Sequence, residues 1–211
     1  MIEKAGTGDR VYLAIKSFLL DESDHRPGDR IDVADLARRV GASATPVRAA
    51  LHRMSGERLL VSHQGEGFSA PRITEVGLTD LYTWNAAVLG QALRTSHPGS
   101  APPLLAIPEG TAAVVRVERL FALIAALSDN VELEWAVAGL NDRMHRIRRV
   151  EEGFVADAEA ELAGMEALLK DYDLAGLRLA IPAYHRRRLK LVPSLSRALH
   201  GLGDRPPRQS I

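Results

Sequence analysis

Residues 32–54 decide the fold of the first part of the chain, and they read DVADLARRVGASATPVRAALHRM. Apolar residues recur there twice at offsets of zero, three, four and seven, which places each set on one face of a helix. The two sets are Val33, Leu36, Ala37 and Val40, then Val47, Ala50, Leu51 and Met54. We expect Asp32 to cap the first helix and Gly41 to end it. Hydroxyls from Ser43 to Thr45 should cap the second helix, with Pro46 at its first position.

The pattern changes after Arg58 to a short apolar strand, residues 59–61. A turn, Gln64-Gly65-Glu66-Gly67, follows it, and Phe68 begins a return strand. Glycine tolerates the positive φ angles of such a turn and lets the backbone approach a phosphate closely. Two short helices, a tight turn and a glycine-tipped hairpin in this order are typical of a winged helix-turn-helix, whose second helix enters the major groove of DNA.

Outward-facing residues of the second helix and of the wing tip are the candidates for contact with DNA. Arg48 suits guanine or phosphate, because its planar guanidinium can donate two parallel hydrogen bonds. Residues 36–74 hold six arginines and two glutamates, so this stretch is basic although the whole chain has a net charge of 0. Each arginine alone is commonly a solvated surface residue, and the ordered set is what favours DNA binding. The predicted DNA-binding residues are Ser43, Thr45, Arg48, His52, Arg53, Gln64 and Gly65.

The run Thr-Pro-Val-Arg-x-Ala-Leu-x-Arg-Met over residues 45–54, followed by Glu-x-Leu-Leu over residues 57–60, resembles the GntR family of transcription regulators. The expected helix over residues 10–22 and the Pro-Gly turn at residues 27–28 match the family as well. The resemblance implies a winged helix-turn-helix domain over residues 1–74 that binds double-stranded operator DNA. Ala44 stands where the family has a base-contacting arginine and Ala49 where it has glutamate, so the family's usual operator sequence is not implied.

Composition excludes several classes of protein. The chain of 211 residues contains no cysteine, which excludes disulfides, thiolate metal sites and cysteine nucleophiles. No apolar run is long enough to span a membrane, and the N-terminus lacks the order of a signal peptide. Metalloprotease, nucleophile-elbow, phosphate-loop and dinucleotide motifs are missing from the sequence. We therefore expect a cytoplasmic protein that is not an enzyme, has no cofactor and has no membrane partner.

Residues 75–200 are helical in pattern almost throughout. The expected helices cover about 78–94, 117–127, 133–147, 154–169, 174–184 and 194–200, with Pro182 as a kink in the fifth. Residues 95–110 are rich in proline and glycine and should form a loop, and residues 201–211 a disordered tail. The predicted fold class is mainly α, an N-terminal winged helix-turn-helix with a small β-hairpin wing followed by an antiparallel α-helical bundle.

This second part resembles the FCD ligand-binding domain of the FadR-like branch of the family. The similarity rests on Asp80-Leu81-Tyr82, on Glu118-Arg119-Leu120-Phe121 and on residues 140–148. Many FCD domains hold a divalent metal with an aspartate and three histidines. The matching positions here carry Glu118, Ala122, Leu162 and either Tyr184 or His185. A lone histidine cannot replace four converging ligands, so we predict no metal. Asn85 stands where the first bundle helix of the family commonly has an arginine.

Three polar residues of the bundle, Asn141, His145 and Arg148, share one helix face at offsets of zero, four and seven. They could line a pocket and hold a carboxylate, but such stripes are more commonly a solvated outer face. The basic run over residues 185–190 has the same alternatives, an anion site or a solvated helix end. The two tryptophans, at positions 84 and 135, are expected in the core or at a dimer interface. The candidate effector-binding residues are Asn85, Asn141, His145, Arg148 and His185.

The sequence therefore predicts a GntR-type transcriptional regulator that dimerises through its helical domain. Operator DNA would be one partner, a second copy of the chain another, and a small organic acid or other metabolite the effector. Effector binding would shift the spacing of the DNA-binding heads through a population shift. The alternative is an effector-independent DNA-binding protein whose bundle serves only dimerisation. The sequence does not distinguish a repressor from an activator.

Overall fold

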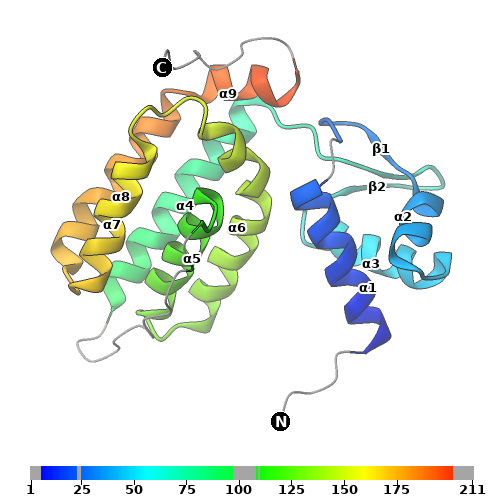
Figure 1. Cartoon of the computed structure of the whole chain (residues 1–211), viewed down its shortest axis with the longest axis horizontal. Coiled ribbons are helices and arrows are strands. Elements are labelled where there is room, and N and C mark those ends of the chain that lie inside the picture. The colour runs from blue at the N-terminus through cyan, green and yellow to red at the C-terminus, as the bar shows by residue number, and fades with distance from the viewer. Residues whose placement is uncertain (1–5, 23–24, 97–107, 109, 202–211) are drawn as a thin grey trace. The chain divides into compact units, whose positions relative to one another are not determined.

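The computed structural model describes residues 6–22, 25–96, 108 and 110–201. The chain divides into two compact units, Met1–Ile73 and Thr74–Ile211. Helices dominate both units, and one small antiparallel sheet lies in the first (Figure 1). This arrangement confirms the predicted fold class. Within the described ranges, no helix combines the length and the apolar character that crossing a membrane requires.

The described part of the first unit contains three α-helices. Helix α1 (Thr7–Ser17) runs into a π-helical turn, η1 (Phe18–Glu22), and α2 (Val33–Val40) and α3 (Ala44–Gly56) follow. The Asp32 carboxylate accepts the N–H groups of residues 34 and 35, and Gly41 ends α2 at a φ of 62°, as the sequence predicts. Pro46 is the third residue of α3 rather than the first, and Ser43 forms no side-chain cap. Proline is tolerated there because the third helical N–H also lacks an intrahelical acceptor.

The sheet has three strands, β1 (Arg30–Ile31), β2 (Val61–His63) and β3 (Gly67–Ser69), in the order β1-β3-β2. The β2–β3 hairpin is the predicted wing, although its first strand begins two residues later than expected. Gly65 and Gly67 have φ angles of 73° and 97°, which explains why glycine occupies both turn positions. The predictions missed β1, because two residues carry no periodicity and its partner strand lies far along the chain.

The core of the first unit lies between α1 and the helix-turn-helix. All four apolar residues expected on the inner face of α3 are buried, whereas only Leu36 of the α2 set is fully so. Ile15 of α1 and Phe68 of β3 complete this core, and neither is more than 4% exposed. The helix-turn-helix is therefore held from behind, and the opposite face of α3 is left outward.

The second unit is a bundle of six described helices (Figure 1). They are α4 (Glu75–Thr95), α5 (Ala113–Ala126), α6 (Val131–Glu151), α7 (Ala158–Lys170), α8 (Leu174–Leu189) and α9 (Val192–Leu199). Helix α8 is continuous through Pro182, and Phe154 lies in a turn before α7 rather than inside that helix. The predicted loop at 97–107 and 109 and most of the predicted tail, 202–211, fall outside the described residues.

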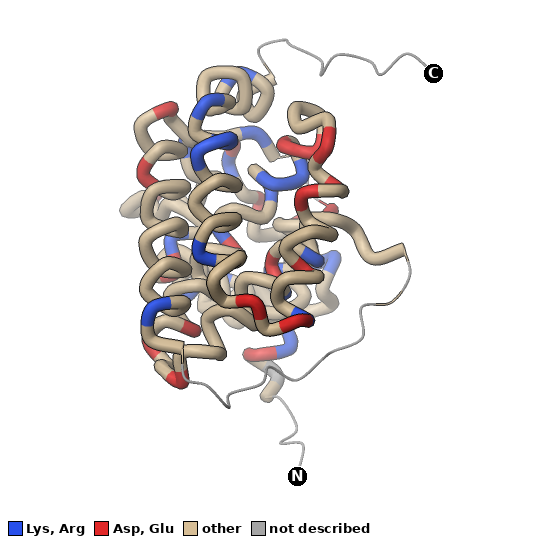
Figure 2. The backbone as a smooth tube through the Cα atoms, turned by 90° about the vertical axis from the view of Figure 1, so that its left-hand side faces the viewer, with Lys and Arg blue, Asp and Glu red and all other residues tan. Residues whose placement is uncertain are grey.

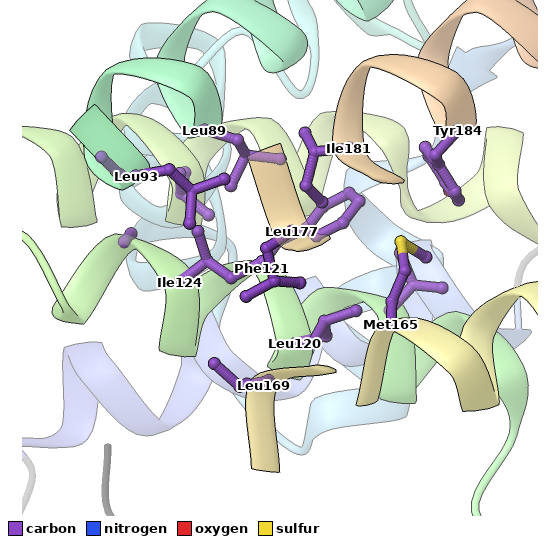
Figure 3. Packing of buried hydrophobic residues seen from close by; sticks show 14 of the residues in the cluster. Leu89, Leu93, Leu120, Phe121, Ile124, Met165, Leu169, Leu177, Ile181 and Tyr184 are labelled. Atoms are coloured by element: carbon purple, nitrogen blue, oxygen red, sulfur yellow. The ribbon is translucent and has the colours of Figure 1, made fainter. Parts of the chain in front are cut away.

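Phe121 of α5 stands at the centre of the bundle core (Figure 3). Leu177 and Ile181 of α8 pack beside it, and the Tyr184 ring meets it edge-on with centroids 5.4 Å apart. The two tryptophans take no part in this core. Trp84 is 56% exposed and Trp135 is 69% exposed, so the first alternative, a place in the core, is wrong, and the second, a dimer interface, stays a prediction.

Candidate functional site

The outward face of α3 begins at its N-terminal turns. Ser43, Thr45, Arg48 and His52 are all exposed there. Their exposure follows from the burial of Val47 and Leu51, which fixes the rotation of the helix. Among the described residues Arg48 has no hydrogen-bond or ion-pair partner, so its guanidinium is available for a ligand outside the chain.

Arg53 lies on the same helix but is engaged within the unit. Its guanidinium donates hydrogen bonds to the carboxylates of Asp9 and Glu57, each at 3.1 Å. It also lies over the Tyr12 ring at 3.8 Å, and the Tyr12 hydroxyl donates to Glu57 at 2.5 Å. These contacts join α1 to the C-terminal end of α3. Arg53 therefore holds α3 against α1, a role that the sequence pattern did not reveal.

The wing places Gln64 and Gly65 at its exposed tip. Its strands are joined by a hydrogen bond of 2.8 Å between the His63 ring and the Ser69 hydroxyl. His52 packs edge-on against Phe68 with ring centroids 4.8 Å apart, so it fixes the wing against α3 as well as facing outward.

Sequence reasoning missed Arg58, which follows α3 and precedes the wing. This exposed arginine has a φ of 63°, in the left-handed region that non-glycine residues rarely adopt. Its position between the recognition helix and the wing was the available signal. It adds one more cation to the edge of the candidate DNA-binding surface.

This architecture agrees with a comparison of sequences. Residues 7–69 match the family model of bacterial regulatory proteins, gntR family. The first unit is a GntR-family helix-turn-helix domain. A curated relative, the Nta operon transcriptional regulator of Aminobacter aminovorans, is 38% identical to the chain over 69 residues. That match spans 33% of this chain and 33% of the relative, so it covers the GntR domain and not the bundle.

Solved structures extend the likeness beyond the GntR domain. E. coli McbR/YncC superimposes with a TM-score of 0.63 at 19% identity, covering 90% of this chain and 98% of that one. A GntR-type regulator from Rhodococcus sp. RHA1 gives a TM-score of 0.67 at 14% identity, covering 89% and 97%. The shared fold includes the helical bundle. At these identities the likeness concerns the fold alone.

A polar cluster on α6 lies inside the bundle rather than on its surface. Asn141, His145 and Arg148 are 8%, 6% and 3% exposed, so the favoured prediction of a solvated outer face is wrong. They surround Glu118 of α5. Asn141 Nδ2 donates to the Glu118 carbonyl at 2.8 Å, and His145 Nδ1 lies 3.0 Å from Glu118 Oε1. Arg148 donates to Asn141 Oδ1 at 3.0 Å and to Glu118 Oε1 at 3.4 Å.

A second buried cluster centres on Glu151 at the end of α6. Arg188 Nε donates to its carboxylate at 2.7 Å, and the Tyr82 hydroxyl donates at 2.5 Å. Arg188 also pairs with Glu161 at 2.7 Å. Burial, with the Glu151 carboxylate as a further cause, raises the pKa of Tyr82 well above its usual value, so the hydroxyl stays a donor. Figure 2 shows acidic positions close to basic ones on neighbouring helices of the bundle.

The basic run over residues 185–190 therefore divides into inward and outward residues. His185 and Arg188 are buried, whereas Arg186 and Lys190 are exposed. Arg187 is half-buried and pairs with Asp157. The interpretation as a solvated helix end is wrong for the two buried residues, because this face of α8 packs toward the bundle interior.

His185 and Asn85 form a third contact in the interior. His185 Nδ1 lies 2.7 Å from the Ile181 carbonyl, and its Nε2 lies 2.8 Å from Asn85 Oδ1. Burial is the main cause that lowers the pKa of His185 to about 4; the hydrogen bond to the Ile181 carbonyl opposes this shift, and the cations Arg148 and Arg188 add to it. The imidazole is therefore neutral at pH 7 and carries one proton. A neutral ring satisfies one of these two oxygens by donating to it.

Two buried donor groups have no partner among the described residues, Asn85 Nδ2 and Arg148 Nε. Arg148 also lines a cavity of about 30 Å³ together with Glu151, Tyr184 and Arg188. That volume accommodates about one water molecule. All five candidate effector residues lie in the interior. The two unmet donors among them suit a ligand that presents acceptor oxygens.

The positions that match the metal ligands of FCD domains do not carry a set of ligating side chains here. Glu118 binds the α6 cluster, Ala122 is exposed and Leu162 belongs to the apolar core. In the described part of the chain, no three histidine, aspartate or glutamate side chains gather as a metal site. Sequence reasoning missed Tyr82 and Glu151 as partners of Arg188, because an acid and a base on different helices show no common spacing.

Proposed function

We propose that this protein is a transcriptional regulator that binds operator DNA through its GntR domain, as a homodimer joined by the helical unit. The observation that carries the proposal is the outward face of α3. This face presents Thr45 and Arg48 from the first two turns, with Arg48 uncommitted among the described residues, in the position from which a recognition helix reaches base edges.

Each candidate residue has a role that its position supports. Arg48 would read guanine or bind phosphate, while Ser43 and the N-terminus of α3 suit a phosphate oxygen. Gln64 and Gly65, at the tip of the wing, would contact the sugar-phosphate backbone of the DNA. Arg53 would act through its contacts with α1, because its guanidinium is already bound to two carboxylates.

The test is selection of duplexes from a random-sequence pool, followed by fluorescence anisotropy of the enriched DNA across a salt series. Arg48→Ala should bind the enriched duplex about 5- to 150-fold more weakly, the loss expected for about 1–3 kcal/mol of base contact. Arg38→Ala is the matched control, because Arg38 is an exposed α2 arginine paired with Asp35. Equal losses in the two variants, or no enrichment of any sequence, would refute the proposal.

The finer proposal is that the bundle binds a small organic anion. The unmet donors of Asn85 and Arg148 support it, since a carboxylate oxygen is the kind of acceptor that each of them lacks. The cavity of about 30 Å³ is too small for a metabolite. A ligand would therefore have to displace Glu118 or Glu151 from its arginine, and this exchange would couple binding to a shift of α6.

The alternative is that the bundle serves only dimerisation. What favours it is that the buried acids and bases among the described residues already neutralise one another. A thermal-shift screen with organic acids separates the two, because a ligand raises the melting temperature by mass action. A shift that disappears in Arg148→Met supports the effector proposal. No shift with any acid, or one that survives this substitution, favours the alternative.

A further inference from the structure

One face of α4 carries regularly spaced residues that do not pack against the rest of the bundle. Val76, Asp80, Thr83, Ala87 and Arg94 follow one another at spacings of four, three, four and seven residues. All are exposed, Val76 at 70%, although Leu78, Tyr82 and Leu89 on the opposite side of the helix are fully buried. Spacings of three, four and seven residues keep side chains in one stripe along a helix, which fits the side of another helix.

Trp84 flanks this seam at its centre and is 56% exposed. A large aromatic side chain left in water is costly unless a partner covers it, and tryptophan is enriched at protein interfaces. The neighbouring seam positions, Thr83 and Ala87, are small, so a second helix can approach closely beside the indole. We call the six residues of this surface, Val76, Asp80, Thr83, Trp84, Ala87 and Arg94, the α4 face.

The charges of the α4 face are self-complementary. Ala87 lies midway between Asp80 and Arg94, seven residues from each. An identical helix placed antiparallel about Ala87 would bring each Asp80 opposite Arg94 of the other copy, so the same ion pair would form twice. Asp80 has no ion-pair partner among the described residues, and Arg94 bonds only to the neutral Gln91 amide there, at 2.6 Å.

The other exposed tryptophan, Trp135 on α6, lacks this arrangement. It lies in the first turns of α6 near two acids, and the cations further along that helix, Arg143, Arg146 and Arg149, already interact within the chain. The exposed surface of α6 therefore serves as the control for the tests of α4 below.

We propose that a second copy of this chain docks antiparallel on the α4 face, with Ala87 at the two-fold axis and Asp80 paired with Arg94 of the second copy. The inference rests on the proposed homodimer and names the surface that forms it. Such a contact is isologous, because the same residues serve both copies. Helix α4 spans 21 residues, about 31 Å. Residues of α8 that border it, among them Arg178, which donates to the Leu93 carbonyl, would extend the contact.

The first test uses the absence of cysteine from the sequence. Ala87→Cys introduces a thiol at the proposed axis, and two such residues can form a disulfide only where their Cα atoms come within about 7 Å. Mild oxidation of the full chain should give a covalent dimer for Ala87→Cys. Ala138→Cys, at an exposed position on α6, is the matched control and should remain uncoupled. Equal coupling of both variants, or none at Ala87→Cys, overturns the proposal.

The second test is charge reversal followed by sedimentation equilibrium. Asp80→Arg and Arg94→Asp should each weaken the dimer at least about ten-fold, or about 1.4 kcal/mol, because two attractive pairs become repulsive. The double variant should recover most of the loss, since it restores both pairs with their signs exchanged. Circular dichroism melting of each variant shows whether the fold is intact.

Three outcomes overturn the inference: unaffected single variants, a double variant as weak as the singles, or a wild-type chain that is monomeric. If that monomer still selects a DNA sequence, the GntR function stands without the α4 contact. If instead the dimer behaves as expected and no DNA is selected, the proposed function fails and the interface stands.

Discussion

The burial of His185 makes the stability of the bundle depend on pH. The side chain is 1% exposed and its pKa is lowered to about 4, chiefly by burial. In the unfolded chain the pKa of histidine is about 6.5. As the pH falls, His185 is therefore protonated in the unfolded chain while it is still neutral in the folded chain. The contribution of His185 to stability is complete above about pH 6.5, declines between about pH 6.5 and 4, and does not decline further below that range.

The size of the effect follows from the difference between the two pKa values. A difference of about 2.5 units at about 1.36 kcal/mol per unit gives a loss of about 3 kcal/mol between pH 7 and pH 4. This is a large part of the free energy of unfolding of an ordinary domain, which is about 5–15 kcal/mol.

The assay is urea unfolding of the wild type and of His185→Gln, measured across the same pH range. Both tryptophans of the chain lie in the bundle, so indole fluorescence reports the unfolding of that unit. Other titrating groups are common to both proteins and cancel in the comparison. The difference in unfolding free energy between wild type and variant should shrink by about 3 kcal/mol from pH 7 to pH 4. A difference that does not change with pH, or an NMR titration of the His185 ring near the ordinary histidine pKa of about 6.5, would refute the reasoning.

Three substitutions test other features of the packing. Arg58→Gly should raise the stability of the GntR domain by about 1 kcal/mol, because glycine adopts the observed φ of 63° without strain; an unchanged or lower melting temperature would contradict this. Gly176→Ala should destabilise the bundle by about 1 kcal/mol despite the better helix propensity of alanine, since the new Cβ would lie 2.6 Å from Oδ2 of Asp173 and displace the carboxylate that caps the helix. An equal or higher urea midpoint for that variant would count against this packing. Tyr82→Phe should cost about 1–3 kcal/mol in urea unfolding, because Glu151 loses a buried donor; a neutral effect would mean that the hydroxyl is not needed there.

Within the GntR domain, local patterns were sufficient for most of the fold. The apolar set of α3 predicted its buried face, and Asp32 and Gly41 predicted both ends of α2. These signals are local because a helix cap and a helix face involve residues only a few positions apart. The exposed position of Arg48 follows from the same face, whereas the engagement of Arg53 depends on α1, which lies more than forty residues earlier.

In the bundle interior, local sequence patterns do not predict which polar side chains are buried. The sequence by itself determined that the chain carries a GntR-type winged helix-turn-helix, that a helical bundle follows, and that Asn141, His145 and Arg148 share one face of a helix. Only the tertiary structure decided that this face is buried, because a polar stripe can meet water or a complementary carboxylate equally well. Here Glu118 lies opposite the stripe and satisfies it. Whether a charged face lies outside or inside depends on the helix it packs against, and no spacing within one helix contains that information.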